Sequence, residues 1–369
     1  MIRILHVVSS LNINAGMMSV IMNYYRNIDR TKIQFDFLYF VEKQENHQNE
    51  ILEFGGRFFY MPYRTFKPSD QKKIRRFFEE HKGEYTAVHC HPIWSSAIIA
   101  REAKKIGIKH VIQHVHSTKY SEKKTSEFRN KILVKFIRFF ATDCIACNSE
   151  AAYLFGGKIV DTGCVYILPN AIDIEKYSFD AECRDGIRKE LGISKTTFVV
   201  GNVGRLSVEK NQLFIVEIFK RILEICPDSK LILVGGGDMQ AQIEKKILEL
   251  NLSENVIMTG KRRDVKALLS AFDLFLMPSI FEGTPVSAIE ALANGLPCVL
   301  SDTVTKSIDM NGVRYIPLAL SASDWARNCI DIADHRKNYD RYDYSDVVHH
   351  GFDIKTEAIK LQNYYLGLE

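Results

Sequence analysis

The sequence lacks long apolar runs. No stretch of 18 consecutive apolar residues occurs, so we expect no transmembrane helix. The apolar run at Ile2–Val8 is too short for the core of a signal peptide, and no small-residue cleavage site follows it. Low-complexity segments and short repeats are also absent. These absences predict a cytoplasmic protein.

Paired metal-binding cysteines are missing as well. The only Cys-x-x-Cys segment is Cys144–Cys147, and the second pair that a zinc site of this type needs is absent. The segment lies in a strand-like run, where residues three apart point to opposite faces. We therefore expect buried free thiols in a reducing compartment, with a metal or redox site at this segment as the alternative.

The composition is that of an ordinary folded protein. Of the 369 residues, 46% are hydrophobic and 25% are charged, and this length suggests two domains. Residues 1–170 contain 25 Lys and Arg against 16 Asp and Glu, a net charge of +9. Residues 171–369 contain 24 against 29, a net charge of −5. The overall net charge of +4 therefore hides two electrostatically different halves.

Short β-rich apolar runs alternate with amphipathic helices along the whole chain. Nearly continuous apolar strands alternating with helices are typical of parallel sheets covered on both faces. Two such sets predict an α/β protein of two Rossmann-like domains, with a linker near Pro169–Tyr177. Ligands of such sheets bind beyond the carboxyl ends of the strands. The expected strands are Ile2–Val8, Phe35–Phe40, Arg57–Met61, Ala87–Cys90, His110–His114, Asp143–Cys147, Val165–Leu168, Phe198–Val203, Leu231–Val234, Val256–Met258, Leu274–Met277, Cys298–Ser301 and Arg314–Ile316.

Residues 278–298 contain the end of a strand and the start of a helix. Thr284 is predicted to be the N-cap of this helix, and Pro285 suits its first turn. The free N–H groups of Val286 and Ser287 then join the positive end of the helix dipole. Such a helix start is suited to binding a phosphate.

Charged side chains accompany this helix start. Glu290 stands one turn along the same helix face, within reach of a ribose hydroxyl, and Glu282 lies in the preceding loop. Two surface carboxylates on a capped helix are the alternative. Arg205 and Lys210 follow the first strand of the second half and could bind a diphosphate, or could lie on a solvated surface.

Two further strand ends carry backbone features of a binding site. Gly236 belongs to a run of three glycines before Asp238, and Val265 follows the strand end at Thr259–Gly260, where a nucleobase edge could meet backbone groups. No strand-helix unit has Gly-x-Gly-x-x-Gly with the spacing of a dinucleotide fold.

Taken together, these motifs resemble the retaining glycosyltransferases of family 4, of the exopolysaccharide and capsule type, which have the GT-B fold. The first half resembles the acceptor domain of that family more loosely, through Ala15–Gly16 and His116. The resemblance implies two Rossmann-like domains that face a central cleft. Its motifs, in family order over residues 165–302, are Leu-Pro-Asn-Ala-Ile-Asp173, Gly-Arg205 with Lys210–Asn211, Val-Gly-Gly-Gly-Asp238, and Phe-Glu282-Gly-Thr-Pro-Val-Ser-Ala-Ile-Glu290.

The resemblance also implies domain and residue roles. Residues 1–168 would bind the acceptor, residues 169–345 the nucleotide-sugar, and residues 346–369 would cross back onto the first domain. The diphosphate would meet Arg205 and Lys210, and His116 would lie near the donor sugar from the opposite domain. The implied catalytic residues are Glu282, His116, Arg205 and Lys210. The implied donor-binding residues are Gly16, Arg205, Lys210, Gly236, Val265, Glu282, Gly283, Thr284, Pro285, Val286, Ser287 and Glu290.

Two departures from the family pattern concern the backbone. Ala171 stands where the family often has glycine, and a positive φ there would cost alanine about 1 kcal/mol or more. Ala15 replaces the first of two paired glycines, which narrows backbone access.

Retention of configuration implies a mechanism. Two-carboxylate hydrolases retain configuration with a nucleophile and an acid about 5 Å apart, and no such pair is identifiable here. We expect front-face substitution, in which the leaving diphosphate accepts the acceptor's proton.

A metal is not expected in this reaction. No DxD-type motif is present, so the expected reaction needs no metal cofactor. Four histidines follow or end adjacent strands, and a metal site there is the alternative to acceptor contacts or packing. They are His89, His91, His114 and His116.

The positive charge of the first half is concentrated in residues 72–78 and 119–140. In the second stretch basic residues alternate with aromatic and aliphatic ones, a pattern suited to a helix on an anionic membrane. A helix that packs its apolar stripe on its own sheet is the alternative. No nucleic-acid recognition motif accompanies the charge.

The leading functional hypothesis is therefore a retaining hexosyltransferase. It would move a sugar from a nucleotide-sugar, with UDP favoured, to a lipid-linked or oligosaccharide acceptor in bacterial envelope or exopolysaccharide synthesis. The alternatives are a nucleotide-sugar epimerase of the same fold and a non-catalytic nucleotide-sugar-binding partner subunit. The expected location is cytoplasmic. Peripheral attachment to the inner face of the plasma membrane is a further possibility that the basic stretches raise.

Overall fold

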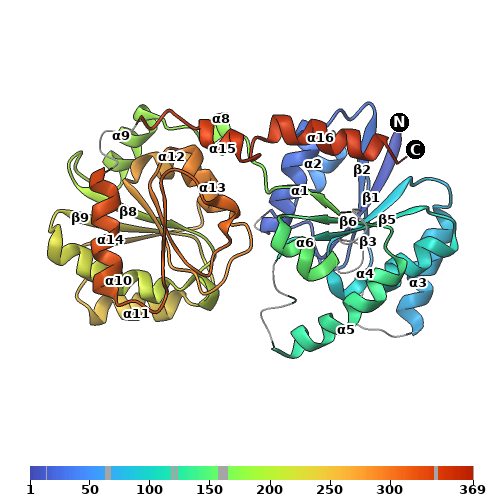
Figure 1. The fold of residues 1–369 in the computed structure, drawn as a ribbon, viewed down its shortest axis with the longest axis horizontal. Coiled ribbons are helices and arrows are strands. Elements are labelled where there is room, and N and C mark those ends of the chain that lie inside the picture. The colour runs from blue at the N-terminus through green and yellow to red at the C-terminus, as the bar shows by residue number, and fades with distance from the viewer. Residues whose placement is uncertain are drawn as a thin grey trace. The chain divides into compact units, whose positions relative to one another are not determined.

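The chain forms two compact units in the computed structural model (Figure 1). The first unit comprises Met1–Ala171 with Ile354–Glu369, and the second comprises Ile172–Asp353. The expected boundaries, at 168/169 and 345/346, lie earlier in both cases. The structure describes residues 1–13, 15–62, 68–117, 120, 124–156, 165–335 and 340–368.

The first unit contains a seven-stranded parallel sheet in the order β3-β2-β1-β4-β5-β6-β7. The order reverses between β1 and β4, which is where doubly wound sheets bind ligands. The strands are β1 (Ile2–Val8), β2 (Ile33–Tyr39), β3 (Phe58–Tyr60), β4 (Ala87–Cys90), β5 (His110–Val115), β6 (Asp143–Ala146) and β7 (Val165–Ile167). The helices are α1 (Gly16–Asn27), α2 (Gln48–Glu53), α3 (Pro68–Glu80), α4 (Ile93–Lys105), α5 (Lys124–Phe140), α6 (Ser149–Gly156) and α16 (Ile354–Leu366).

The second unit contains a six-stranded parallel sheet in the order β10-β9-β8-β11-β12-β13. The strands are β8 (Phe198–Val203), β9 (Ser229–Val234), β10 (Val256–Gly260), β11 (Leu274–Met277), β12 (Cys298–Ser301) and β13 (Val313–Ile316). The helices are α8 (Ile174–Tyr177), α9 (Ala181–Glu190), the 3-10 turn η1 (Val208–Lys210), α10 (Gln212–Ile225), α11 (Gln240–Glu249), α12 (Val265–Ala271), α13 (Val286–Ala293), the 3-10 turn η2 (Lys306–Ile308), α14 (Ala322–His335) and α15 (Ser345–His349).

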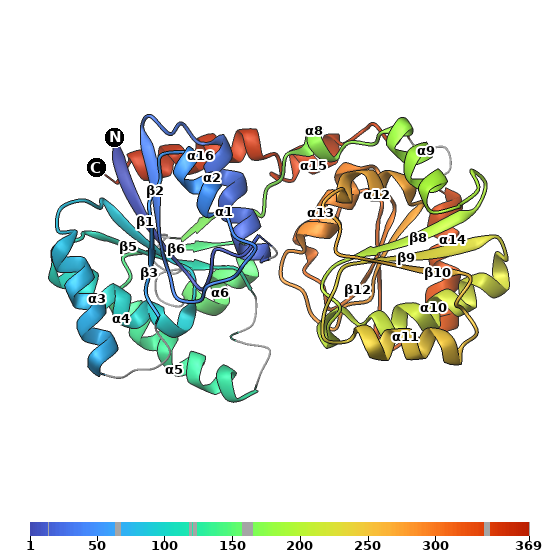
Figure 2. The same cartoon turned by 180° about the vertical axis from the view of Figure 1, so that it is seen from behind.

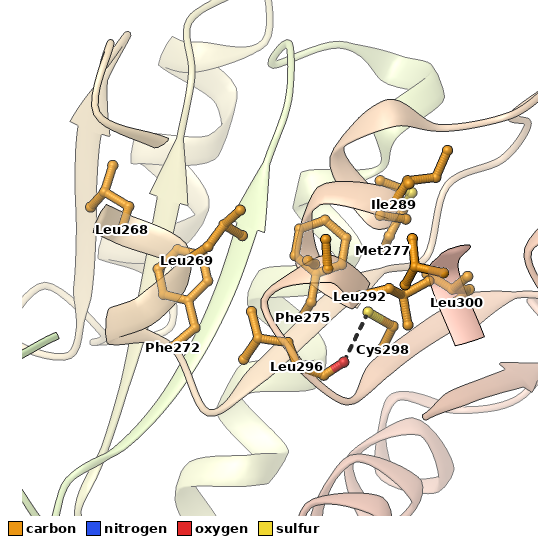
Figure 3. Close-up of a cluster of buried hydrophobic side chains, with 14 of the residues drawn as sticks. Leu268, Leu269, Phe272, Phe275, Met277, Ile289, Leu292, Leu296, Cys298 and Leu300 are labelled. Carbon is orange, nitrogen blue, oxygen red and sulfur yellow. Dashed lines mark hydrogen bonds between the residues drawn. The ribbon is translucent and has the colours of Figure 1, made fainter. Parts of the chain in front are cut away.

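Helices cover both faces of this second sheet, so strands β11 and β12 are fully buried, while the outer strands β10 and β13 are partly exposed. One core cluster joins α12 and α13 to β11 and β12, with Phe272, Phe275 and Leu292 among its members (Figure 3). A second cluster packs α10, α11 and α14 on the other face. The two parallel sheets confirm the predicted α/β class, because strands buried on both faces require the continuous apolar runs seen in the sequence.

The C-terminal helix α16 belongs to the first unit, as expected of the C-terminal segment. It lies beside α1 in both views of the ribbon (Figure 2). The backbone N–H of Asp29 donates to the side chain of Gln362 at 2.9 Å, and the Tyr365 hydroxyl reaches the His89 ring. Among the described residues, no helix is long and apolar enough to span a bilayer.

The Cys144–Cys147 segment lies on and just after β6. Both thiols are buried, and neither forms a disulfide with a described cysteine. Burial raises the pKa of Cys144 to about 12, so its thiol stays protonated. A protonated thiol is a poor nucleophile and a poor metal ligand, which favours the packing interpretation of this segment.

Ala171 adopts an unstrained conformation. The non-glycine residues with positive φ in the described chain are Asn211 and Asn251. Ala171 is fully buried, and its carbonyl accepts a hydrogen bond from the Asn23 amide at 3.2 Å. The concern that alanine is strained at this position is therefore unfounded.

We predict that Ala171→Gly lowers the free energy of unfolding by about 1 kcal/mol, because glycine adds unfolded-state entropy and here relieves no strain. Urea unfolding followed by circular dichroism measures the change. Gly186→Ala is the matched control. Gly186 lies inside α9 with open space at the Cβ position, so this change should stabilise the protein by about 1 kcal/mol. A more stable Ala171→Gly protein would contradict the prediction.

Candidate functional site

The loops after β8 and β9 in the second unit touch backbone to backbone. A Cβ atom at Gly235 would lie 1.9 Å from the Gly204 carbonyl oxygen, and one at Gly237 would lie 2.2 Å from that of Leu206. Gly235 also has a φ of +142°. Glycine is therefore required at both positions. At Gly236, the residue predicted from the sequence, an added Cβ would lie at ordinary contact distance from the Lys261 side chain. The close approach of the loop after β9 to the loop after β8 places main-chain groups of both loops at this edge of the sheet.

Two predicted diphosphate ligands lie at this edge in different states. Lys210 ends η1, and its ammonium group forms an ion pair with the Glu282 carboxylate, which comes from the loop after β11. Both side chains are largely buried. Arg205 pairs with Asp238 at 3.1 Å, but both side chains are exposed, so this contact contributes little. The structure thus holds Lys210 in place and leaves Arg205 able to turn toward a ligand.

Asn211 explains how Lys210 is held at the strand end. Its φ of +57° is left-handed, a conformation that asparagine tolerates better than most residues. Its amide donates to the Pro278 carbonyl at 3.0 Å, which ties η1 to the loop after β11. The sequence showed this asparagine next to Lys210, but its role as a turn residue was not predicted.

The start of α13 differs from the prediction by one residue. Pro285 is the N-cap, in an extended conformation, and Val286 is the first helical residue. The Thr284 hydroxyl instead contacts the Ser307 hydroxyl at 3.4 Å, so the prediction that Thr284 caps the helix is wrong. Pro285 itself provides no side-chain cap for this helix. The first N–H groups, at Val286 and Ser287, stand at the positive end of the helix dipole, where an anion is favoured.

Glu290 lies one turn along α13 in a partly buried position. Burial raises the pKa of its carboxyl to about 7, although a hydrogen bond with Tyr177 and the charge of Lys176 oppose the shift. Near neutral pH the carboxyl is therefore partly protonated. In that state it can both donate and accept a hydrogen bond, which suits a pair of hydroxyl groups.

The remaining predicted donor residues lie in the same strand-end loops. Gly283 follows Glu282 directly and is partly buried. Val265 begins α12, and its side chain packs against the core of the second unit. A ligand contact at Val265 would therefore come from its backbone.

Gly16 begins α1 in the first unit. The preceding Ala15 gives the helix no side-chain cap. No described atom lies within 4 Å of the place where a Cβ would stand at Gly16. This helix start therefore has open space beside its backbone.

Five histidines lie at the carboxyl edge of the first sheet. His6 on β1 pairs in register with His89 on β4. β5 is the next strand and carries His114, while His91 and His116 directly follow β4 and β5. The sequence indicated four of them. The pairing of β1 with β4, strands about 80 residues apart in the chain, adds the fifth. We call His6, His89, His91, His114 and His116 the histidine cluster.

Ring nitrogens connect the members of the cluster. The Nδ1 atom of His6 lies 3.0 Å from Nε2 of His91, and Nδ1 of His91 lies 2.7 Å from Nε2 of His116. Separately, Nδ1 of His89 lies 2.6 Å from the hydroxyl of Tyr365 on α16. The C-terminal helix thus contributes a side chain to this edge of the sheet.

The imidazoles of the cluster are neutral near pH 7. Burial lowers the pKa of His6 to about 3 and that of His116 to about 4, and the repulsion of His116 adds to the shift of His6. Burial also lowers the pKa values of the other three well below the usual range. Neutral imidazoles are ligands for zinc-like ions. Two sets have their ligand atoms within 4.8 Å of one another: His6, His89 and His91, and His91, His114 and His116.

Comparison with known proteins gives relatives along the whole chain. Residues 184–312 match the family described as "Glycosyl transferases group 1". The chain is 30% identical over 370 residues to "Putative glycosyltransferase EpsF" of Bacillus subtilis (strain 168), with 98% of this chain and 96% of that protein covered. It is 29% identical over 281 residues to the UDP-Gal:alpha-D-GlcNAc-diphosphoundecaprenol alpha-1,3-galactosyltransferase of Escherichia coli, with 73% and 72% covered.

Solved structures show the same fold. Anabaena Alr3699/HepE in complex with UDP-glucose has a TM-score of 0.78 and 19% identity, with all of both chains covered. WaaG, a glycosyltransferase involved in lipopolysaccharide biosynthesis, has a TM-score of 0.73 and 15% identity, with 99% of this chain and 100% of that chain covered. The two parallel-sheet units therefore have the predicted GT-B fold.

We predict that Glu290→Gln stabilises the unliganded protein at pH 8. The raised pKa means that the folded state binds the proton more tightly than the unfolded state, so wild-type stability falls as pH rises from about 4.5 through about 7. The variant lacks this loss and should be more stable by roughly 1–3 kcal/mol at pH 8, with the difference vanishing near pH 4.5.

Thermal unfolding of both proteins across this pH range measures the difference. Glu254→Gln, at an exposed position of the same unit, is the control and should change stability little at any pH. A Glu290→Gln effect that is independent of pH would show that the Glu290 carboxyl does not titrate abnormally.

Proposed function

Since this chain belongs to the group 1 glycosyl transferase family and has its GT-B fold, we propose that it is a retaining hexosyltransferase of bacterial polysaccharide synthesis. It would move a sugar from a UDP-sugar to a lipid-linked or oligosaccharide acceptor. Three relatives support these details: the HepE complex contains UDP-glucose, the E. coli enzyme is named for UDP-Gal and a diphosphoundecaprenol acceptor, and CapH of Staphylococcus aureus is a capsular polysaccharide enzyme.

The observation that carries the proposal is the group of charges at the edge of the second sheet. Lys210, Arg205 and the start of α13 bring two cations and a helix N-terminus to one set of loops. This combination matches a diphosphate, which has negative charge on both phosphoryl groups. The second unit is acidic overall, so these positive groups reflect a local site rather than the net charge.

In the site without a ligand, the Glu282 carboxylate is the partner of the Lys210 ammonium group. A bound diphosphate would compete for the Lys210 ammonium group, because a dianion attracts it more strongly than one carboxylate. Glu282 would then be free to accept hydrogen bonds from hydroxyl groups of the donor sugar. The same ion pair thus keeps both side chains in the binding geometry before the donor arrives.

The proposed reaction is front-face substitution. An acceptor hydroxyl oxygen bonds to the anomeric carbon on the face that the UDP leaves, and the carbon–oxygen bond to the diphosphate breaks. The hydroxyl proton passes to a diphosphate oxygen, so no protein base is needed. Arg205, Lys210 and the α13 N–H groups would stabilise the developing charge, which is commonly the largest catalytic contribution. The reaction needs no metal ion.

The other predicted residues take supporting roles in the proposal. Glu290 would bind the ribose hydroxyls, and His116 and Gly16 of the first unit would meet the sugar and the acceptor. The first unit would bind the acceptor and the second the donor. The proposed donor-binding loops contain Gly236, Val265, Gly283, Thr284, Pro285, Val286 and Ser287. The named relatives are glycosyltransferases, so they give no support to the epimerase alternative.

We expect Lys210→Ala and Arg205→Ala each to lower kcat by about 100-fold or more, because each removes a cation from the leaving diphosphate. Thermal shift selects the donor, and UDP release with membrane-extracted lipid acceptors, followed by product analysis, measures transfer and anomeric configuration. Lys245→Ala, an exposed change on α11, is the matched control and should keep wild-type turnover. Full activity is expected in EDTA.

Near-wild-type turnover in either variant would contradict the diphosphate assignment. Donor binding without any turnover would support the non-catalytic partner subunit instead. An inverted product would contradict retention, and loss of activity in EDTA that added metal restores would contradict the metal-free reaction.

Helix α5 supports peripheral attachment to an anionic membrane. Val134 and Ile137 point inward and are buried, so the helix packs on its own unit by that stripe. Its opposite face exposes apolar and basic side chains together, which the packing alternative does not explain. The exposed residues are Phe128, Arg129, Lys131, Ile132, Lys135, Phe136 and Phe139. Phe139 is 83% exposed and Phe128 is 71% exposed. A helix with this face suits the interface of a negatively charged leaflet.

We predict that Lys135→Glu with Phe139→Ser weakens binding to phosphatidylglycerol vesicles by about tenfold or more, because a charge is reversed and an apolar anchor is lost. Co-sedimentation measures the bound fraction, and phosphatidylcholine vesicles test the charge requirement. Lys245→Glu in the second unit is the matched charge-reversal control. Unchanged sedimentation of the double variant would contradict the membrane assignment of α5.

A further inference from the structure

Three members of the histidine cluster form a continuous hydrogen-bonded chain. The chain runs from His6 through His91 to His116, with nitrogen-to-nitrogen distances of 3.0 Å and 2.7 Å. His6 and His91 are buried, and His116 is partly exposed. Each distance is short enough for one ring to donate an N–H group and the next ring to accept it.

The three proton positions in this chain are coupled. A neutral imidazole has one N–H donor and one acceptor nitrogen, so both links must run in the same direction through His91. In one arrangement His6 donates from Nδ1, His91 donates from Nδ1, and His116 accepts at Nε2, which leaves its proton on Nδ1. In the other arrangement His116 donates from Nε2, and the last proton lies on Nε2 of His6.

The surroundings of His6 distinguish the two arrangements. Its Nε2 atom is buried and has no hydrogen-bond partner within the described part of the chain. Its ring packs on Phe35 and Phe37, with centroid distances of 4.2 Å and 5.6 Å. The second arrangement would leave a buried N–H group at Nε2 of His6 without an acceptor among the described residues. The first leaves only an unused acceptor, and among backbone groups buried N–H donors without partners are the rarer case.

We propose that His6 and His91 fix His116 as the Nδ1–H tautomer, so that His116 offers a hydrogen-bond donor rather than a basic lone pair at the end of β5. His6 and His91 are then positioning residues. Stacking adds to the constraint, because the His114 and His116 ring centroids lie 3.9 Å apart.

The tautomer follows from the structure, but its consequence for the reaction rests on the proposed function. That consequence is the chemical role of His116. A donor N–H group can bind an oxygen of the sugar or of the acceptor, but it cannot remove a proton from the acceptor hydroxyl. His116 is then excluded as the base, which agrees with transfer of the proton to the leaving diphosphate in front-face substitution. Through the histidine chain, His116 would therefore bind substrate by donating a hydrogen bond and would not act as a base.

The tautomer is measured by NMR of protein labelled with nitrogen-15 in histidine, independently of any activity. The His116 signals are assigned by their loss in His116→Asn. We expect the proton on Nδ1 in the wild-type protein and a shift toward Nε2–H in His91→Phe. His6→Phe is the second variant, because a phenyl ring suits the pocket of Phe35 and Phe37, and it should shift the tautomer in the same direction. His349→Asn, at an exposed position, is the control.

Kinetics give the second readout. Asparagine can donate from nearly the position of Nδ1, so we expect His116→Asn to keep about tenfold more kcat/KM than His116→Leu, the effect of about one hydrogen bond. For His91→Phe we expect kcat to fall about tenfold with little change in the donor KM, because the His116 donor loses its orientation.

An Nε2–H tautomer of His116 in the wild-type protein would overturn the proposal. So would a His116 tautomer that stays the same in His91→Phe and His6→Phe when both variants are folded. Equal loss of activity in His116→Asn and His116→Leu would also overturn it. Zinc bound tightly to the purified protein and lost in His91→Phe would also overturn it, because the rings would then be metal ligands. A protein with the expected His116 tautomer but no transfer activity would contradict the proposed function. The proposed hydrogen-bond direction from His6 through His91 to His116 would still hold.

Discussion

In both units the geometry depends on one constraint: all strands of a parallel sheet end at the same edge. Residues that are far apart in the chain but directly follow neighbouring strands are therefore brought together. In the second unit this edge collects Lys210 after β8 and Glu282 after β11 into one ion pair. In the first unit it collects histidines from β1, β4 and β5. Neither group is formed by a local sequence pattern, and both follow from strand order.

The two sheet edges use opposite electrostatic solutions. In the second unit, charged side chains form ion pairs, Lys210 with Glu282 and Arg205 with Asp238. In the first unit, burial lowers the pKa of every member of the histidine cluster, and the rings stay neutral. The first solution suits binding a dianion by exchange of partners, and the second suits directed hydrogen bonds to neutral hydroxyl groups. This contrast agrees with the proposal that the second unit binds the donor and the first unit the acceptor.

Helix α5 has both a buried apolar stripe and an exposed face that carries apolar side chains. Its apolar residues were expected either to pack on the sheet or to face a membrane. The structure assigns Val134 and Ile137 to packing, while Phe128, Phe136 and Phe139 remain exposed next to basic residues. The positive charge of the first half is thus partly placed on a face that is also apolar. Net charge alone could not separate these two uses.

The sequence by itself determined the α/β class, the two sheets and the segments that follow the strands, because apolar periodicity and glycine or proline signals act over a few residues. It also indicated the residues of the strand-end loops that we propose bind the donor. Only the tertiary structure decided that Pro285 rather than Thr284 begins the α13 turn, that Ala171 is unstrained, that Gly235 and Gly237 are the required glycines, and that His6 joins the histidine cluster. Each of these depends on a contact with a distant strand or loop. Burial and hydrogen-bond partners, which set the pKa of Glu290 and the direction of the histidine chain, exist only once those segments have packed together.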